Sequence, residues 1–413
     1  MPNNNVPDAV FEAAAAQFPT PFYLYDEAGI RDTARKVNQA FAWAPGFKEH
    51  FAVKALPNPE ILKILLEEGC GLDCSSRTEL IIARRLGLWG EDIMFSANAM
   101  PPEEFALARS LGALINLDDP SDIQTLHENG GIPKTISLRV NPGPEVLGDN
   151  LFMGSPQESK FGWMTKDIRP GLEKLAGLGA TRFGLHAMLA SNSLNPGYYP
   201  AQADFLLGLG LQLQEETGLK LAFINLAGGI GIPYRPEEQG VDILAVGQSV
   251  REVYLRRLGK DQGVAIKTEL GRFVTGPHGF LVTRAVHRKD GHKVFIGLDA
   301  SAVNLMRPAM YGAYHHATVP GKEHLPRSLT ADLTGALCEN NDKFALNRAL
   351  PPLSLGDLVI LHDAGAHGWA MGYQYNGRLR SAEVLHQLDG SFRLIRRAET
   401  PEDYFATLNV GGE

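Results

Sequence analysis

Cysteine is scarce in this 413-residue chain, which contains only Cys70, Cys74 and Cys338. A disulfide framework or a cysteine-based zinc site needs several cysteines at short intervals, so three scattered thiols argue against both. A reducing compartment follows, and we predict a cytoplasmic location. Each thiol is then either a small apolar core residue or a reactive group.

Long apolar runs and excess positive charge are also lacking. No run approaches the roughly 20 apolar residues that span a membrane. Lys and Arg number 39 against 47 Asp and Glu, which gives a net charge of -8 and no electrostatic reason to bind nucleic acid or a membrane surface. The polar first residues contain no basic segment followed by an apolar core, so we expect no secretory signal.

A repeated alternation of short apolar runs and longer amphipathic segments extends from residue 30 to about residue 272. The longer segments, such as 60–68, 78–86, 102–111 and 201–217, have helical periodicity. The apolar runs predict strands at 50–55, 69–74, 92–97, 113–118, 135–140, 183–188, 221–226 and 264–269. Eight near-even units favour a closed (β/α)8 barrel over a doubly wound sheet, which also shows alternation.

The remainder of the chain predicts a second, all-β domain. Strand-like runs at 279–286, 293–298, 357–361 and 393–397 lie between Gly- and Pro-containing turns, as in a sandwich or Greek-key fold. Before the barrel come a helical stretch at 9–17 and an aromatic strand at 21–26. Because the barrel is already complete, we expect segment 1–29 to pack on the β-domain, with the barrel at 30–272 and the β-domain at 273–413.

Functional residues of such a barrel lie at the C-terminal ends of its strands. Those ends carry Lys54, Asp73, Asn98, Asp118, Asn141, His186, Gly228, Gly229, Glu269 and Arg272. Lys54 follows a buried apolar run, so its ammonium either snorkels to solvent or is paired, deprotonated or used covalently. Asp118 and Asn141 can equally cap turns, and the glycines can be ordinary turn residues or can let backbone N–H groups approach a phosphate.

Taken together, the motifs resemble those of the fold-type III pyridoxal-phosphate-dependent decarboxylases, and most of all the diaminopimelate decarboxylase family. The resemblance begins near residue 20 and reaches the region around residue 400. It rests on Phe-Ala-Val-Lys at 51–54, Gly-Leu-Asp-Cys at 71–74, Gly-Leu-His at 184–186, Gly-Gly-Ile-Gly at 228–231, Glu-Leu-Gly-Arg at 269–272, Arg-Pro-Ala-Met-Tyr at 307–311, Cys-Glu at 338–339 and Gly-Ala-His-Gly at 365–368.

The resemblance implies a set of residues for pyridoxal phosphate. Lys54 would hold the cofactor through a Schiff base, and Glu269 would pair with the pyridine nitrogen so that the ring can accept electrons. His186 would stack on the ring face, although it can also be a satisfied core histidine. The other positions implied for cofactor binding are Asp73, Ser191, Gly228, Gly229, Gly271, Arg272 and Tyr375.

A second set of residues is implied for the substrate. Arg307 suits a distal carboxylate, because a guanidinium binds carboxylates with two hydrogen bonds, although Arg307 and Tyr311 can also be parts of a structural contact. Cys338 would return a proton after carbon dioxide leaves, from the neighbouring subunit, which implies a homodimer with shared active sites. The positions implied for the substrate are Arg272, Arg307, Tyr311, Glu339, His367 and Tyr375.

The implied reaction is decarboxylation of meso-2,6-diaminopimelate to L-lysine and carbon dioxide, the last step of lysine biosynthesis. Related substrates stay open, namely carboxynorspermidine or ornithine, lysine and arginine, as does a catalytically inactive regulatory homologue that binds the cofactor. A Schiff-base lyase without the cofactor is a further alternative. No metal is expected, because the adjacent His315 and His316 lack a carboxylate at helical ligand spacing.

The chain also departs from the family pattern around the phosphate and the distal end of the substrate. Ala187 to Ser191 replaces the usual Gly-Ser after the histidine, Ala227 begins the glycine triplet, and Leu270 stands for a proline. His367 occupies a position where a tyrosine is common, and Asn340 one where serine is usual. We therefore expect the chemistry to be kept, with the substrate identity less constrained than the reaction type.

Overall fold

The computed structural model describes residues 6–143, 158–259 and 263–409. The chain divides into two compact units. The β-unit consists of Met1–Ile30, Pro233–Glu238 and Val274–Glu413, and the barrel unit of Arg31–Ile232 and Gln239–Phe273. The unit boundaries lie one residue beyond the 29/30 and 272/273 expected from the sequence, and the short segment Pro233–Glu238 was not expected to group with the β-unit.

The barrel unit contains a closed ring of eight parallel strands, so the predicted barrel is confirmed. Around the ring run β2, β3, β4, β5, β6, β8, β9 and β10, which pairs again with β2. Their bounds are Lys48–Ala52, Gly71–Cys74, Ile93–Ser96, Leu114–Leu117, Thr135–Asn141, Arg182–His186, Lys220–Asn225 and Ala265–Thr268. The short β7 (Trp163–Met164) pairs with β6 outside the ring. Each of the eight predicted runs overlaps one of these strands, because strands buried on both faces are rich in apolar residues.

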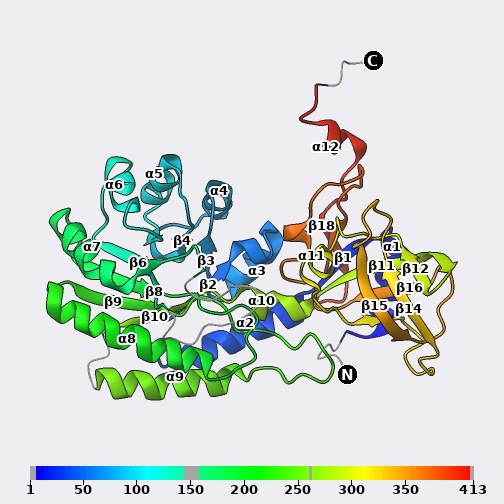
Figure 1. Cartoon of the computed structure of the whole chain (residues 1–413), viewed down its shortest axis with the longest axis horizontal. Helices are drawn as coiled ribbons and strands as arrows, with labels where there is room; N and C mark the ends of the chain where they lie inside the picture. Colours follow the sequence, from blue (N-terminus) through cyan, green and yellow to red (C-terminus); the bar gives the residue numbers. More distant parts are fainter. Residues whose placement is uncertain (1–5, 144–157, 260–262, 410–413) are drawn as a thin grey trace. The chain divides into compact units, whose positions relative to one another are not determined.

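Helices cover the outside of these strands, as Figure 1 shows for the blue to green part of the chain. Their bounds are α2 Glu27–Phe41, α3 Pro59–Glu67, α4 Arg77–Arg85, α5 Pro102–Ser110, α6 Asp122–Glu128, α7 Thr165–Gly177, α8 Tyr198–Thr217 and α9 Ile243–Leu258. The short helix α10 (Gly271–Thr275) follows β10, and the 3-10 turn η2 (Gly90–Asp92) precedes β4. Side-chain caps fix several starts: the Asn58 side chain accepts from the Glu60 N–H at 3.0 Å. Helix α8 begins three residues before the predicted 201, because Pro200 fits in a first helical turn.

Lys54 does not lie on a strand, which corrects the prediction of a strand over 50–55. β2 ends at Ala52, the last residue with a partner on β3, and Val53–Ala55 forms the 3-10 turn η1. The prolines at 57 and 59 follow at once, and a proline biases the residue before it away from helix. The turn is therefore confined to three residues, and Lys54 stands at its centre.

The β-unit is built on a nine-stranded mixed sheet rather than on antiparallel strands alone. The order is β15-β14-β12-β11-β1-β17-β18, with β16 paired to β11 and β13. The pairs β1–β17 and β12–β14 are parallel. The bounds are β1 Phe22–Asp26, β11 Gly279–Asp290, β12 Val294–Leu298, β13 Ala317–Thr318, β14 Leu329–Thr334, β15 Lys343–Leu350, β16 Leu358–Leu361, β17 Ala382–His386 and β18 Phe392–Arg396.

Short helical elements accompany the sheet of the predicted β-domain. They are α1 Asp8–Gln17, α11 Arg307–Tyr311, α12 Pro401–Phe405, η3 Gly276–His278 and η4 Trp369–Met371. The N-terminal strand joins the sheet as predicted, between β11 and β17. Helix α1 contributes Phe11 to a core cluster with Phe22, Phe280 and Val384, all at most 1% exposed. This burial explains why the N-terminal segment groups with the β-unit.

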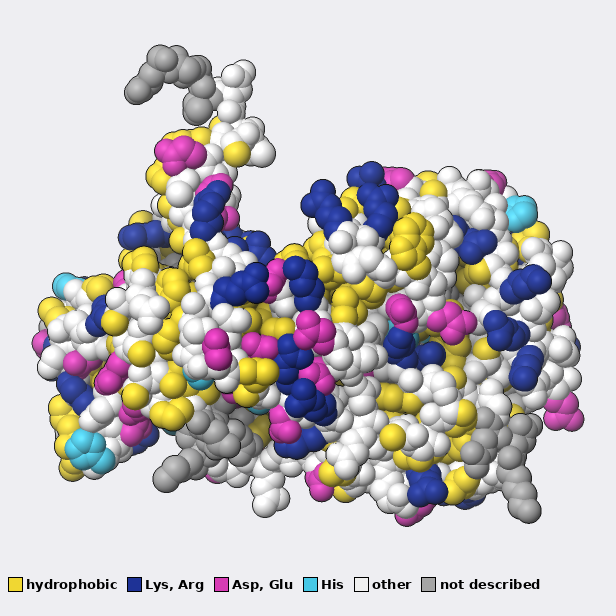
Figure 2. All heavy atoms as spheres, turned by 180° about the vertical axis from the view of Figure 1, so that it is seen from behind, with side chains coloured by type: hydrophobic (Ala, Val, Ile, Leu, Met, Phe, Trp, Pro, Cys, Tyr) yellow, Lys and Arg dark blue, Asp and Glu magenta, His cyan; other side chains and the backbone are white. Residues whose placement is uncertain are grey.

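The surface mixes charges of both signs. On the face that Figure 2 shows, basic, acidic and apolar side chains are intermingled. Within the part of the chain that the structure describes, no helix combines the length and the apolar character needed to cross a membrane.

Candidate active site

Lys54 stands at the end of the barrel where the strands finish. Its Nζ lies 3.7 Å from Oδ2 of Asp73 on β3. The Lys54 side chain is 52% exposed, whereas that of Asp73 is fully buried. The two sequence interpretations of Lys54 are therefore both partly realised: the amine is paired with a buried carboxyl, yet it reaches solvent and is accessible to a small molecule.

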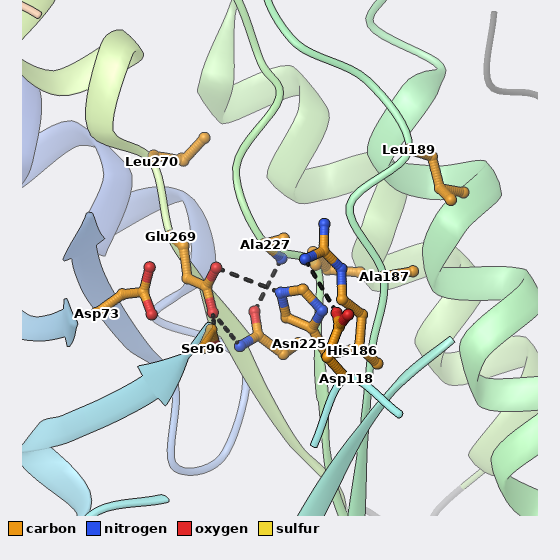
Figure 3. Close-up of polar contacts among 12 residues, drawn as sticks. Asp73, Ser96, Asp118, His186, Ala187, Leu189, Asn225, Ala227, Glu269 and Leu270 are labelled. Atoms are coloured by element: carbon orange, nitrogen blue, oxygen red, sulfur yellow. Dashed lines mark hydrogen bonds and ion pairs between the residues drawn. The ribbon is translucent and has the colours of Figure 1, made fainter. Parts of the chain in front are cut away.

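Glu269 is the centre of a polar network built from four strand ends (Figure 3). One carboxylate oxygen, Oε1, accepts from Asn225 Nδ2 at 2.7 Å and from Ser96 Oγ at 3.5 Å. The other lies 3.3 Å from Nε2 of His186. Because a carboxylate only accepts, that nitrogen of His186 carries the hydrogen. Ser96, His186 and Asn225 are the last residues of β4, β8 and β9, and Glu269 follows β10 directly.

The two buried carboxyl groups of this site hold protons differently. Burial alone would raise the pKa of Glu269, but His186, Lys54 and Asn225 together outweigh it and lower the pKa below the usual range. Burial, followed by the neighbouring charge of Glu269, raises the pKa of Asp73 well above its usual value. Like charges this close disfavour double ionisation, so a shared proton is favoured on Asp73 and the negative charge on Glu269.

His186 is more than a satisfied core histidine. Its ring is buried, and Nδ1 has no hydrogen-bond partner among the described residues, as is also true of both carboxyl oxygens of Asp73. Buried polar atoms are seldom left unpaired in a native protein, so such atoms mark places where a ligand or water completes the structure. All of them lie on strand ends at the same side of the barrel.

Glu49 contacts the two residues that flank Glu269. It was not singled out from the sequence, where the predicted strand began at residue 50. It is fully buried on β2. Its Oε1 accepts from the backbone N–H of Leu270 at 2.6 Å, and Oε2 accepts from the Thr268 hydroxyl. The residues on either side of Glu269 are thereby tied to β2. Burial raises the pKa of Glu49 to about 7.

Replacing Glu49 with glutamine is expected to change how stability depends on pH. The folded carboxyl keeps its proton up to about pH 7, whereas the unfolded one loses it near 4.5. The contribution of the Glu49 carboxyl to the free energy of unfolding is therefore fully present below the unfolded-state pKa near 4.5, and it is lost as the pH rises through the folded-state pKa of about 7. Relative to wild type, Glu49→Gln should gain up to about 3 kcal/mol between about pH 5 and pH 8.

Urea unfolding at several pH values measures this difference. The amide can still accept from Leu270 and donate to the Thr268 hydroxyl, so the fold should survive the change. Glu103→Gln, at an exposed position of α5, is the matched control and should show no such gain. A constant difference between Glu49→Gln and wild type across the pH range would contradict the assignment.

Asp118 and Asn141, for which capping a turn was an alternative to binding a ligand, have different roles in the structure. The Oδ1 of Asp118 accepts from Arg139 Nη1 at 3.4 Å, so it is an ion-pair partner rather than a cap. Arg139, on β6, was not singled out from the sequence, and its guanidinium carbon also lies 4.2 Å from the ring centre of Phe161. Asn141 does shape a turn, since its Oδ1 accepts from the N–H of Gly143 at 3.1 Å.

Two loops after β8 and β9 are joined to each other beside this network. The N–H of Ser193 donates to the Gly229 carbonyl, and the N–H of Gly231 donates to the Ser193 carbonyl, both at 2.8 Å. Gly229 has a φ of 103°, and a Cβ there would lie 2.7 Å from the Ala190 carbonyl oxygen. Only glycine tolerates both conditions. The loops carry Ser191, Gly228 and Gly229, the expected phosphate residues.

Gly271 and Arg272 begin α10 next to the lysine turn. A Cβ on Gly271 would lie 2.6 Å from the Cβ of Ala55, so glycine allows α10 to approach η1. The N–H of Gly271 donates to the Glu269 carbonyl at 3.0 Å, and Arg272 is half-buried. The structure thus assembles Lys54, Asp73, His186 and Glu269 with the expected phosphate residues on one end of one unit.

Cys338 and Glu339 lie on an exposed loop of the β-unit. The N–H of Cys338 donates to Oδ1 of Asn376 at 2.7 Å, and Oε1 of Glu339 accepts from the N–H of Asn341 at 2.9 Å. Buried Asp342 anchors the loop by accepting from the N–H groups of Leu337 and Ala302. The thiol is thus held at the surface by a fixed backbone, and it forms no disulfide.

The remaining expected residues also belong to the β-unit and differ in exposure. Arg307, the first residue of α11, is 2% exposed, whereas Tyr311, at the end of this helix, is 46% exposed. Tyr375 is 45% exposed, and its neighbour Asn376 bonds the Cys338 backbone. The backbone of His367 has a φ of 55°, a value that residues other than glycine rarely adopt, so the surrounding loop sets its conformation.

The barrel residues fit pyridoxal phosphate in charge and accessibility. An ionised buried carboxylate can pair with a protonated ring nitrogen, an accessible lysine can bond an aldehyde carbon, and the joined glycine loops allow close approach of a phosphate. The unpartnered atoms of Asp73 and His186 lie on strands of the same barrel. The described residues contain no group of His, Cys, Asp and Glu that could hold a metal ion.

Comparison with known proteins agrees with this chemistry. Residues 27–276 match the family described as pyridoxal-dependent decarboxylase, pyridoxal binding domain. Among relatives, Protein TabA of Pseudomonas amygdali pv. tabaci is 43% identical, covering 94% of this chain and 90% of that protein. The diaminopimelate decarboxylase of Methanothermobacter thermautotrophicus is 33% identical, covering 96% and 93%.

Solved structures extend the agreement to both units. The diaminopimelate decarboxylase from M. jannaschii, solved in complex with L-lysine, superposes with a TM-score of 0.89 at 27% identity, covering 97% of this chain and 94% of that one. A lysine decarboxylase from Selenomonas ruminantium, at 21% identity and a TM-score of 0.82, shares the fold. The chain therefore belongs to the pyridoxal-dependent decarboxylase family and is an amino-acid decarboxylase that uses pyridoxal phosphate.

Proposed function

We propose that this enzyme decarboxylates meso-2,6-diaminopimelate to L-lysine and carbon dioxide, as the last step of lysine biosynthesis in the cytoplasm. The diaminopimelate decarboxylase names of relatives at 30–33% identity support this substrate. The more similar Protein TabA has a name that states no substrate, so the substrate has to be argued from residues.

The observation that carries the proposal is the buried guanidinium of Arg307. A cation at 2% exposure is costly unless it has fixed partners, and Arg307 has them in Tyr234 and His315. Such a group suits a ligand carboxylate, which it can bind with two parallel hydrogen bonds. Ornithine, lysine and arginine end in a cation that this guanidinium would repel, whereas diaminopimelate ends in an amino acid group with a carboxylate.

The barrel residues then have assigned roles. Lys54 would bond the cofactor, Glu269 would keep the ring nitrogen protonated, His186 would lie against the ring, and the residues around the phosphate would be Ser191, Gly228, Gly229, Gly271 and Arg272, with Asp73 and Tyr375 as further contacts. When bound, pyridoxal phosphate supplies a sink for the electron pair released as the carbon–carboxylate bond breaks. The low pKa of Glu269 supports its role, because an ionised partner favours a protonated ring nitrogen.

Cys338 would complete the reaction by donating the proton of its Sγ to the carbon that has lost carbon dioxide. Its exposed position in the β-unit supports a site shared between two subunits of a homodimer. Exposed Glu339 would bind the distal amino group, with Arg272, Arg307, Tyr311, His367 and Tyr375 around the distal end of the substrate. The three free cysteines suit a reducing cytoplasm.

The test combines a spectrum with a substrate comparison. Purified enzyme reconstituted with pyridoxal phosphate is expected to show the visible band of the lysine-bound cofactor. It should release carbon dioxide from meso-diaminopimelate, and at least about 100-fold more slowly from L-lysine, L-ornithine and L-arginine. We expect this factor because a substrate without a distal carboxylate would leave the Arg307 guanidinium without its ligand partner, and sites built to bind a polar group reject substrates that lack it.

Each other outcome identifies an alternative. Release only from carboxynorspermidine would keep the reaction type and move the specificity to another substrate with a carboxylate. Release from ornithine, lysine or arginine in preference to diaminopimelate would contradict the role given to Arg307. Absence of the band after reconstitution would contradict the role of Lys54.

A further inference from the structure

Two side chains hold one edge of the Arg307 guanidinium in the β-unit. Nη1 of Arg307 donates to the hydroxyl of Tyr234 at 2.7 Å and lies 3.3 Å from Nε2 of His315. The guanidinium carbon also lies 4.9 Å from the centre of the Tyr234 ring. The rings of Tyr234 and His315 pack edge to face at 5.2 Å. The three side chains form one buried cluster, with His315 fully buried and Tyr234 only 8% exposed.

The protonation of His315 follows from its other contact. Its Nδ1 lies 2.9 Å from the backbone carbonyl oxygen of His362, and a carbonyl only accepts. Nδ1 therefore carries the hydrogen, and Nε2 of the neutral ring presents a lone pair to Arg307, which only donates. Both contacts require the same tautomer, so the cluster is internally consistent.

The His315 ring is fixed by the sheet around it. The carbonyl of His315 accepts from Arg348 Nη1 at 3.1 Å. The N–H of His362 donates to the His316 carbonyl at 2.8 Å, which extends the antiparallel pairing of β13 with β16. Because the two strands already restrict the motion of the His315 ring, the ring can fix the orientation of Arg307 at a small further cost in conformational entropy.

Both hydrogens of Arg307 Nη1 have acceptors within this cluster. Nη1 has two hydrogens, and Tyr234 and His315 engage one each. These two contacts, together with the packing of the rings, fix the orientation of the guanidinium. We propose that Tyr234 and His315 are positioning residues that orient the Arg307 guanidinium for the distal carboxylate, and thereby set specificity for substrates with an acidic end. The inference rests on the proposed function for the identity of that carboxylate.

The experiment uses the reconstituted enzyme with two variants and two ligands. Tyr234→Phe removes the hydroxyl that accepts from Arg307 and keeps the ring. His315→Gln offers an amide in place of the imidazole, with a displaced acceptor. L-Lysine carries the carboxylate that remains after the reaction, and cadaverine is the same chain without it. Binding of both ligands is measured by calorimetry, and KM and kcat are measured with meso-diaminopimelate.

Tyr234→Phe is expected to weaken L-lysine binding and raise the KM about 10-fold, because a hydrogen bond to a charged group is lost. Cadaverine binding and kcat should change less than about twofold. His315→Gln should act in the same direction. The matched control is Tyr314→Phe, the same chemical change at a hydroxyl that contacts His316 at 3.0 Å, and it should leave all four values unchanged.

The failures of the two proposals are distinguishable. Equal loss of L-lysine and cadaverine binding in Tyr234→Phe, or a fall in kcat at constant KM, would overturn the positioning role. Equal affinity of the wild-type enzyme for the two ligands would also overturn it. A wild-type enzyme that prefers L-lysine to cadaverine but releases no carbon dioxide from diaminopimelate would sink the proposed function while the binding ratios still decide the role of Tyr234 and His315.

Discussion

Replacing Lys54 with alanine is expected to abolish the visible cofactor band and to lower the rate of carbon dioxide release by at least about 10³-fold. The reason is chemical: the described site offers this accessible amine beside Asp73, 3.7 Å away, and the bond to an aldehyde needs an amine. The half-exposed side chain contributes little packing, so the free energy of unfolding should change by less than about 1 kcal/mol.

Borohydride reduction followed by peptide mass spectrometry locates the bond directly. The wild-type enzyme should carry the reduced cofactor on the peptide that contains residue 54, and Lys54→Ala should carry none. Lys63→Ala is the matched control, because Lys63 is an exposed lysine of the neighbouring helix α3 and pairs with Glu60. A Lys54→Ala enzyme that keeps the band, or a reduced adduct at another lysine, would refute the assignment.

Replacing Cys338 with alanine is expected to lower kcat by about 10²–10⁴-fold, the usual contribution of a positioned general acid. Cofactor binding should be retained, because the thiol lies in the β-unit and the expected Schiff-base lysine in the barrel unit. In deuterated water the wild-type enzyme should deliver deuterium to one face of the reacting carbon. Cys338→Ala should deliver it to both faces, because solvent is then the donor.

Two comparisons separate the thiol from its loop. Asn340→Ala changes an exposed neighbour on the same loop and should leave kcat and the deuterium outcome unchanged. If sites are shared, co-expressed Lys54→Ala and Cys338→Ala chains should recover about a quarter of the wild-type activity, because half of the dimers then contain one intact site. No recovery together with confirmed mixed dimers would place Cys338 and Lys54 of one chain in the same site.

The family residues could be named from the sequence, but their surroundings could not. Ser96, Asn225 and Glu49 all bear on Glu269, and they precede it by between 44 and 220 positions in the chain. No local pattern marks them, because each is a polar residue on a strand whose partner at Glu269 lies far away in the chain. The same holds for His315, which was considered as part of an unlikely metal pair and instead contacts Arg307 eight residues before it.

Some strands of the β-unit were predicted from the sequence and others were not. β11, β12, β16 and β18 were predicted within a few residues, whereas β14, β15 and β17 were not. β14 and β15 carry polar residues, among them buried Asp332, which Lys293 pairs from 39 residues away. In the sequence of 329–334 alone, an aspartate argues against a buried strand, because burying an unpaired carboxylate costs free energy. In the folded protein Lys293 pairs with this carboxylate and offsets that cost.

By itself, the sequence determined the eight barrel strands, the helices between them, the attachment of the N-terminal strand to the sheet and the order of the family motifs. These features depend on short-range periodicity and on residue types, which are local properties. Only the tertiary structure decided that Lys54 lies on a turn, that the pKa of Asp73 is raised while that of Glu269 is lowered, and that Tyr234 and His315 contact Arg307. Those outcomes depend on burial and on distances between atoms far apart in the chain, and no window of sequence contains either quantity.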